Sequence, residues 1–107
     1  MKSFAELGLS NEVLKVLNEL GITEPTEIQE KSIPVALAGT DIIGESASGS
    51  GKTLAFSSAI IERLIPNHKV QALILTPTRE LTEQVAMSIR RFSKFKHLKT
   101  IPVYGGV

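Results

Sequence analysis

The sequence contains no cysteine and only two histidines among its 107 residues. Disulfide frameworks and thiolate metal sites are therefore excluded, and two separated histidines do not make a metal cluster. Residues 72–75 are typical of the longest apolar runs, which are far shorter than the roughly 18 residues that a membrane span needs. Residues 1–6 lack the apolar stretch of a secretory signal, so we expect a cytoplasmic chain without membrane contact.

The composition is that of an ordinary globular domain, with 42% hydrophobic and 21% charged residues. The net charge of +1 conceals an asymmetry, because residues 1–62 carry nine acidic and four basic side chains, whereas residues 63–107 carry two acidic and eight basic ones. Five of the basic residues lie within residues 90–99, together with two phenylalanines. This segment is either a nucleic-acid-binding surface or a solvated helix end, and composition alone favours the helix end.

Capping residues and apolar spacing predict four helices, between Ser10 and Gly21, from Thr26 to about residue 37, over 52–64, and from 78 to about 92. Pro34 is expected to kink or divide the second helix. Apolar runs predict strands at 41–45, 70–75 and 100–104. Alternating strands and helices indicate an α/β fold, a parallel sheet with crossover helices.

A phosphate-binding sequence connects the first expected strand to the third expected helix. Glycines there let successive backbone N–H groups face a phosphate, and the following helix N-terminus adds a favourable dipole. Lys52 is expected to reach the β- and γ-phosphates and the Thr53 hydroxyl to bind Mg²⁺. The general pattern begins with glycine, where this chain has Ser46. The alternative is a flexible turn with an incidental lysine. In order, the residues are Ser46, Ala47, Ser48, Gly49, Ser50, Gly51, Lys52 and Thr53.

Three further elements accompany this loop: residues 21–29 with Phe4 upstream, residues 77–81, and Gly105–Gly106. In this order and spacing the chain resembles the N-terminal half of the first RecA-like domain of DEAD-box ATP-dependent RNA helicases, a P-loop NTPase fold. The region 4–29 is similar to the family's Q motif and residues 46–53 to its motif I, which commonly has Ala at position 46 and Thr at position 48. Residues 77–81 are similar to motif Ia, and residues 105–106 to the GG element.

The resemblance implies that ATP and Mg²⁺ are the cofactors, with Lys52 and Thr53 in the catalytic machinery. It further implies that Gln29 hydrogen-bonds adenine and that Phe4 stacks on the base. Both residues have a structural alternative. Gln29 can complete a capping box with Thr26, and Phe4 can anchor a small core.

The resemblance also implies that RNA is the partner and is held through its sugar-phosphate backbone, without sequence preference. The implied contacts are Pro77, Thr78, Arg79, Gly105 and Gly106. A helix N-terminus with a guanidinium suits a phosphodiester. The structural alternative is that Thr78 is only an N-cap and Glu80 a partner of the helix dipole; Thr78 can serve both purposes.

The family's Asp-Glu-Ala-Asp motif is absent from these residues, as are later motifs and the second domain with its arginine finger. We therefore expect residues 1–107 to be the N-terminal portion of a RecA-like domain, with exposed strand edges that favour self-association. The expected parent is an RNA helicase and ATPase that unwinds duplexes or remodels RNA–protein complexes, while this portion alone is inactive. Two alternatives are a non-catalytic nucleotide- or RNA-binding module, including a truncation product, and an unrelated P-loop kinase. The Q motif disfavours the kinase.

Overall fold

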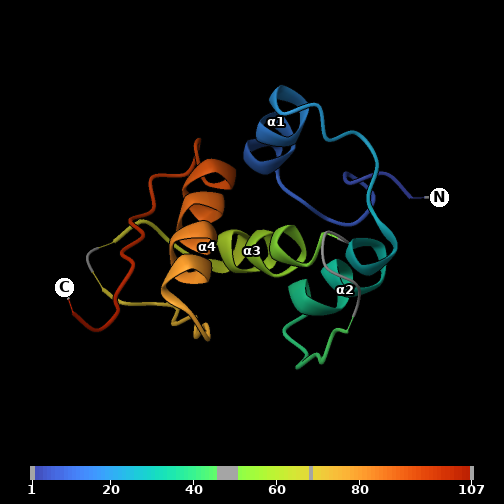
Figure 1. Cartoon of the computed structure of the whole chain (residues 1–107). Coiled ribbons are helices and arrows are strands. Elements are labelled where there is room, and N and C mark those ends of the chain that lie inside the picture. Colours follow the sequence, from blue (N-terminus) through green and yellow to red (C-terminus); the bar gives the residue numbers. More distant parts are fainter. Residues whose placement is uncertain (1, 46–50, 68, 107) are drawn as a thin grey trace.

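A computed structural model describes residues 2–45, 51–67 and 69–106 of the chain. In these residues the regular elements are four helices, α1 (Asn11–Glu19), α2 (Glu27–Leu37), α3 (Lys52–Arg63) and α4 (Arg79–Phe92). Helix α3 lies in the middle of the array, packed against α2 on one side and α4 on the other, as Figure 1 shows. Helix α1 packs against α4. The four helices confirm the four that capping and periodicity predict.

Helices α1 and α2 end in the same way, because a glycine in the left-handed region follows each of them. Gly21 has φ 73° and Gly39 has φ 85°. After α1, the Ile22 N–H donates to the Leu17 carbonyl at 2.9 Å, which satisfies a carbonyl that the helix leaves without a partner. The predicted end of the first helix at Gly21 is confirmed.

Pro34 lies inside α2, and the helix is not divided there. Proline lacks the N–H that would bond to the preceding turn, but one missing hydrogen bond does not end a helix whose other turns are held. Ile33, next to the proline, is fully buried, and the C-terminal turn closes at Gly39. The expected division of this helix is therefore wrong, and the kink that was its alternative stays a prediction.

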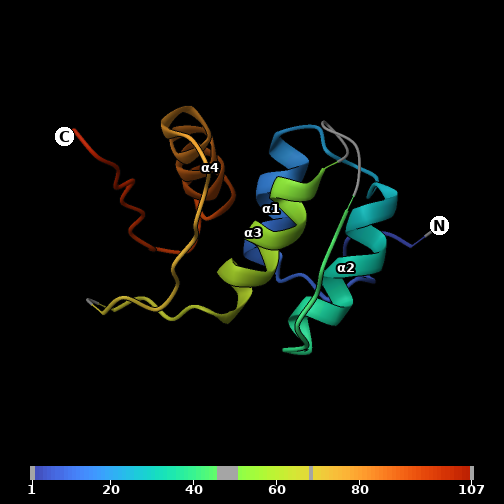
Figure 2. The same cartoon turned by 60° about the horizontal axis from the view of Figure 1, so that its bottom comes forward.

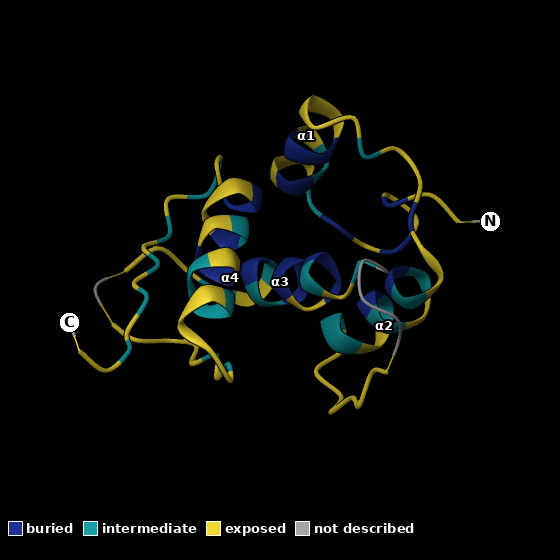
Figure 3. Cartoon of the chain, viewed as in Figure 1, coloured by how far each residue is buried: buried dark blue, intermediate teal, exposed yellow. Residues whose placement is uncertain are grey.

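The hydrophobic core lies where the N-terminal segment and the four helices meet. Figure 3 shows the buried stretches of α1, α3 and α4 turned toward one another, while the connecting segments are mostly exposed. No helix of the described residues is both long and apolar enough to cross a membrane. The core cluster consists of Phe4, Leu7, Leu9, Val13, Val16, Leu17, Ile33, Leu54, Ala55, Ile61, Val85, Ile89 and Phe92.

The three segments expected to be strands form no hydrogen-bonded ladder in the described residues. They run as irregular chain in Figures 1 and 2. Most of their apolar side chains are exposed, 93% for Ile43, 91% for Val70 and 81% for Leu73, while Ile74 is partly buried against the core. A strand needs the N–H and C=O groups of a neighbouring strand, and these segments do not pair with each other. The strands predicted at residues 41–45, 70–75 and 100–104 are therefore not formed among the described residues.

Candidate functional site

The phosphate-binding sequence enters helix α3 through Gly51. This glycine has φ 96°, a conformation that side chains disfavour, and its carbonyl accepts the first helical hydrogen bond from the Ala55 N–H at 3.1 Å. Lys52 is exposed and Thr53 half-buried on the first turn of α3. The other predicted residues of this loop lie outside the described residues: Ser46, Ala47, Ser48, Gly49 and Ser50.

Gln29 joins the start of α2 to the end of the phosphate-binding sequence. Its Oε1 accepts a hydrogen bond from the Thr26 N–H at 2.9 Å, and its Nε2 donates to the Gly51 carbonyl at 3.2 Å. A Cβ atom added at Gly51 would collide with Gln29 Nε2 and lie 2.9 Å from Thr26 Oγ1. The capping role that the sequence allowed for Gln29 is confirmed, and the structure adds the contact with Gly51.

Counting only the residues that the structure describes, these two contacts leave Gln29 with hydrogen-bonding capacity. A carboxamide has two N–H donors and two carbonyl lone pairs, and the bonds to Thr26 and Gly51 use one of each. The remaining donor and acceptor are the pair that adenine N7 and its N6 amino group require. Capping the helix and binding an adenine edge are therefore compatible, although only 4% of Gln29 is exposed.

Phe4 belongs to the hydrophobic core, with 4% of its surface exposed. This burial favours the core-anchor alternative, and stacking of Phe4 on a base stays a prediction. Adenine stacking would require one face of the ring to become accessible.

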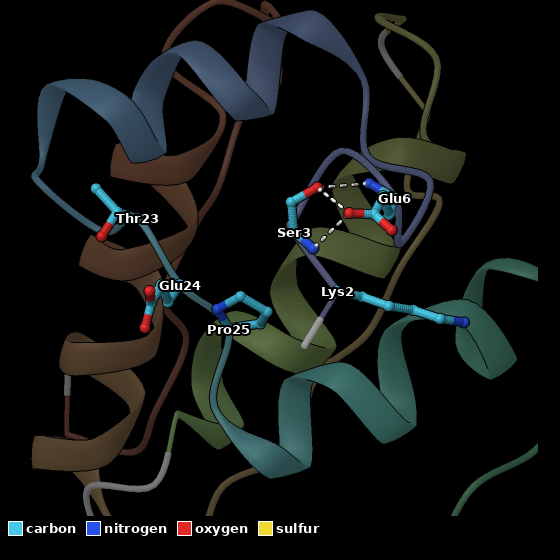
Figure 4. A pocket seen from close by; sticks show the side chains of 6 residues that line it. All are labelled: Lys2, Ser3, Glu6, Thr23, Glu24 and Pro25. Carbon is cyan, nitrogen blue, oxygen red and sulfur yellow. Dashed lines mark hydrogen bonds between the residues drawn. The ribbon is translucent and has the colours of Figure 1, made fainter.

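A hollow of about 290 Å³ opens between the N-terminal segment and the residues that precede α2. Figure 4 shows Ser3 and Glu6 on one wall and Thr23, Glu24 and Pro25 on the opposite one. The Ser3 N–H and hydroxyl donate to Glu6 Oε1 at 3.2 and 3.1 Å, and these hydrogen bonds lower the pKa of Glu6. Thr23, Glu24 and Pro25 belong to the motif at residues 21–29 that the sequence singled out, whereas Ser3 and Glu6 on the other wall were not predicted to have a role.

A second candidate region lies at the start of α4. The Leu81 N–H donates to Thr78 Oγ1 at 3.1 Å, so the predicted N-cap role of Thr78 is confirmed. The Thr82 hydroxyl donates to the Thr78 carbonyl at 2.9 Å, which further holds the first turn. Pro77, Thr78 and Arg79 are all exposed, so this helix start presents N–H groups and a guanidinium to solvent.

The structure brings Arg79 next to the Gly105–Gly106 turn. A Cβ atom added at Gly106, which has φ 82°, would lie 3.2 Å from a guanidinium nitrogen of Arg79. The Arg79 guanidinium carbon also lies 5.8 Å from the centre of the Tyr104 ring, and the Tyr104 hydroxyl donates to Glu83 Oε1 at 2.9 Å. Sequence reasoning named Arg79 and the two glycines but missed Tyr104 and Glu83, whose contact joins segments distant in the chain.

The basic segment 90–99 contacts the protein more than its charge suggests. Arg90 donates to the Thr100 carbonyl at 3.0 Å, and Lys94 forms an ion pair with Glu19 at 3.3 Å. Lys96 donates to the carbonyl at the end of α3, on Ile61, at 2.5 Å. These contacts favour the alternative that the segment is a solvated helix end with structural roles.

Comparisons with known proteins show where this arrangement recurs. A family model described as DEAD/DEAH box helicase matches residues 26–107. The chain is 48% identical over 104 residues to a protein of Helicobacter pylori named DEAD-box ATP-dependent RNA helicase RhpA. That alignment covers 97% of this chain and 21% of the relative, so the chain spans about a fifth of the length of the curated relatives it matches.

Solved structures match the backbone as well. A DEAD box protein from Methanococcus jannaschii is 42% identical with a TM-score of 0.93, covering 98% of this chain and 29% of that one. The RNA helicase Prp28 from Chaetomium thermophilum, bound to ADP, is 37% identical with a TM-score of 0.88 over 100% of this chain and 28% of that one. Dbp5 from S. cerevisiae, bound to RNA and ADP BeF3, is 38% identical with a TM-score of 0.84 over 90% and 25%. These matches confirm the predicted α/β, RecA-like fold class.

Proposed function

The chain belongs to the DEAD/DEAH box helicase family, and from this premise we propose that it serves ATP-dependent unwinding of RNA duplexes or remodelling of RNA–protein complexes. Its own contribution is to bind an adenine nucleotide at the start of α3 and the RNA backbone at the start of α4. Prp28 bound to ADP and Dbp5 bound to RNA and ADP BeF3 support both parts by similarity.

The contact between Gln29 and Gly51 carries the nucleotide half of the proposal. It places a buried carboxamide, with one donor and one acceptor unused among the described residues, against the last glycine of a phosphate-binding sequence. A single adenine nucleotide then contacts both parts, its base at Gln29 and its phosphates at residues 46–53. The hollow lined by Ser3 and Pro25 lies directly before α2. Its volume of about 290 Å³ is close to that of the smallest ordinary ligand pockets, about 300 Å³.

Lys52 and Thr53 act on the phosphates in this proposal. An exposed ammonium on the first turn of α3 suits the β- and γ-phosphates, and a neighbouring hydroxyl suits Mg²⁺ held jointly with phosphate oxygens. The described residues hold no group of three or more His, Asp or Glu side chains that could bind a metal by themselves. A magnesium ion bound beside the Thr53 hydroxyl would take phosphate oxygens and water as further ligands and would neutralise phosphate charge.

The RNA half rests on the convergence of Arg79 with the Gly105–Gly106 turn. Both are exposed, and both border the N-terminal turn of α4, where backbone N–H groups face solvent. Pro77 and Thr78 complete the same surface. Contacts of this kind hold phosphates and carry no information about base sequence.

Within this proposal residues 1–107 form the N-terminal portion of the ATP-binding domain, located in the cytoplasm. Exposed apolar side chains such as Val70 and Leu73 support self-association as a further property.

Competition between ATP and GTP against a fluorescent adenine nucleotide tests the proposed base contact. Gln29→Ala removes the base contact, so the ATP and GTP affinities should become similar. The difference between their binding free energies should shrink by about 1–3 kcal/mol. Lys52→Ala is the matched variant, because losing phosphate attraction should weaken both nucleotides equally. Circular dichroism confirms that the helices persist in both variants. An ATP preference that survives in the Gln29 variant would exclude adenine recognition by this side chain.

A further inference from the structure

We propose that Tyr104 is a positioning residue that keeps the Arg79 guanidinium available to an RNA phosphate by engaging the Glu83 carboxylate. The inference rests on the proposed RNA contact at Arg79 and adds a device that governs it. Tyr104 lies directly before the Gly105–Gly106 turn, so one short segment both orients the arginine and borders the RNA surface.

On helix α4, Glu83 could pair with the Arg79 guanidinium, and Tyr104 contacts both side chains instead. Arg79 and Glu83 stand four residues apart, which places their side chains on the same face of the helix, close enough to form an ion pair. No such pair joins them among the residues that the structure describes. Instead, the Tyr104 hydroxyl donates to Glu83 Oε1 at 2.9 Å.

The aromatic ring of Tyr104 holds the arginine on the other side. The guanidinium carbon of Arg79 lies 5.8 Å from the ring centre, within the range of a cation–π contact. The guanidinium then extends toward Gly106, where an added Cβ would approach it to 3.2 Å. The side chain of Tyr104 therefore contacts both Glu83 and Arg79, and the charge of Arg79 stays beside the glycine turn.

The hydrogen bond persists across the neutral range, because it is made by the protonated phenol. Donation to the Glu83 carboxylate raises the pKa of Tyr104, and the charge of Glu80 acts in the same direction. The chain contains one tyrosine and no tryptophan, so its near-ultraviolet absorbance reports on Tyr104 alone. Titration of this absorbance should show a pKa above 10.0, falling back toward that value in Glu83→Gln. A pKa at the ordinary value in the unmodified chain would overturn the proposed contact.

The decisive test is a cycle of variants, read by fluorescence anisotropy with a fluorescein-labelled oligouridylate RNA at low salt. Tyr104→Phe keeps the ring but releases Glu83, which then pairs with Arg79, and RNA affinity should fall about two- to fivefold. Glu83→Gln alone should change affinity little, because a carboxamide oxygen still accepts from the hydroxyl. Combining Tyr104→Phe with Glu83→Gln should restore affinity, since the competing charge is gone. If Tyr104 had only a structural role, RNA affinity would not be restored in the double variant.

Two controls separate the inference from its premise. Arg79→Ala tests the RNA contact itself, and an unchanged affinity would refute the proposed RNA site together with the inference. Glu80→Gln, placed in the Tyr104→Phe background, removes an equal charge near the same turn and should not restore affinity as Glu83→Gln does. If Arg79→Ala weakens binding while Tyr104→Phe does not, or if both glutamate changes restore it equally, the positioning role is overturned and the RNA site stands.

Discussion

Gly51 is the residue on which the geometry of the nucleotide region depends most. Its φ of 96° disfavours a side chain, and an added Cβ would force the Gln29 carboxamide to shift. Gly51→Ala should lower the free energy of unfolding by more than the roughly 1–2 kcal/mol of a left-handed alanine, because the methyl group also collides with the carboxamide. The variant should also lose nucleotide affinity, since Gln29 must move.

Gly21→Ala is the matched control for this prediction. Gly21 has a φ of 73° but no atom within 4 Å of an added Cβ, so only the conformational cost applies. Urea unfolding compares the two variants, and nucleotide titration follows each. Equal losses of stability in both variants, with equal nucleotide affinity, would show that the contact between Gly51 and Gln29 has no consequence.

Helices and strands differ in how close in sequence the residues that determine them lie. The cap at Thr78, the glycine at position 21 and the apolar stripe of α4 act within one or two helical turns, so the sequence predicts the helices well. Strands depend on partners elsewhere in the chain, and the exposed segment 70–75 has none among the described residues. Periodicity gives no information about pairing, which is why the predicted strands are not formed among the described residues while the fold class is confirmed.

In the candidate site, too, roles set by nearby residues could be predicted and contacts between distant segments could not. Motif order predicts that Gln29 and Arg79 are functional residues, and capping rules predict what Gln29 does for α2. Neither rule predicts that Gln29 donates to Gly51 or that Tyr104 donates to Glu83, because both contacts join segments far apart in sequence.

The end of α3 supplies a prediction about the basic segment. Lys96 donates to the carbonyls of Ile61 and Glu62 at 2.5 and 3.3 Å, where a positive charge also favours the helix dipole. Lys96→Met should therefore cost about 1 kcal/mol of stability in urea unfolding. Lys99→Met, at an exposed position with no hydrogen bond or ion pair to the residues that the structure describes, should cost nothing measurable. A loss of RNA affinity in Lys96→Met without a loss of stability would return the segment to the nucleic-acid-binding alternative.

The whole molecule presents apolar side chains that the described residues leave uncovered. Ile43, Val70 and Leu73 are each more than 80% exposed. Surface of this kind drives association, so sedimentation velocity should show oligomers that increase with concentration. Leu73→Lys should shift the distribution toward monomer. Met87→Lys, on the surface of α4, should leave it unchanged, and equal effects of both would argue against association through residues 70–75.

The most direct test of the account concerns its two separate binding regions. The chain is titrated with a fluorescent ATP analogue in the presence of Mg²⁺ and, separately, with a fluorescein-labelled oligouridylate RNA. Lys52→Ala, at the start of α3, should lose ATP binding and keep RNA binding, because it removes attraction to nucleotide phosphates only. Arg79→Ala, at the start of α4, should do the reverse, and its remaining RNA binding should depend less steeply on salt. If both ligands bind the unaltered chain and each variant weakens both equally, or neither, the assignment of nucleotide to α3 and RNA to α4 is contradicted.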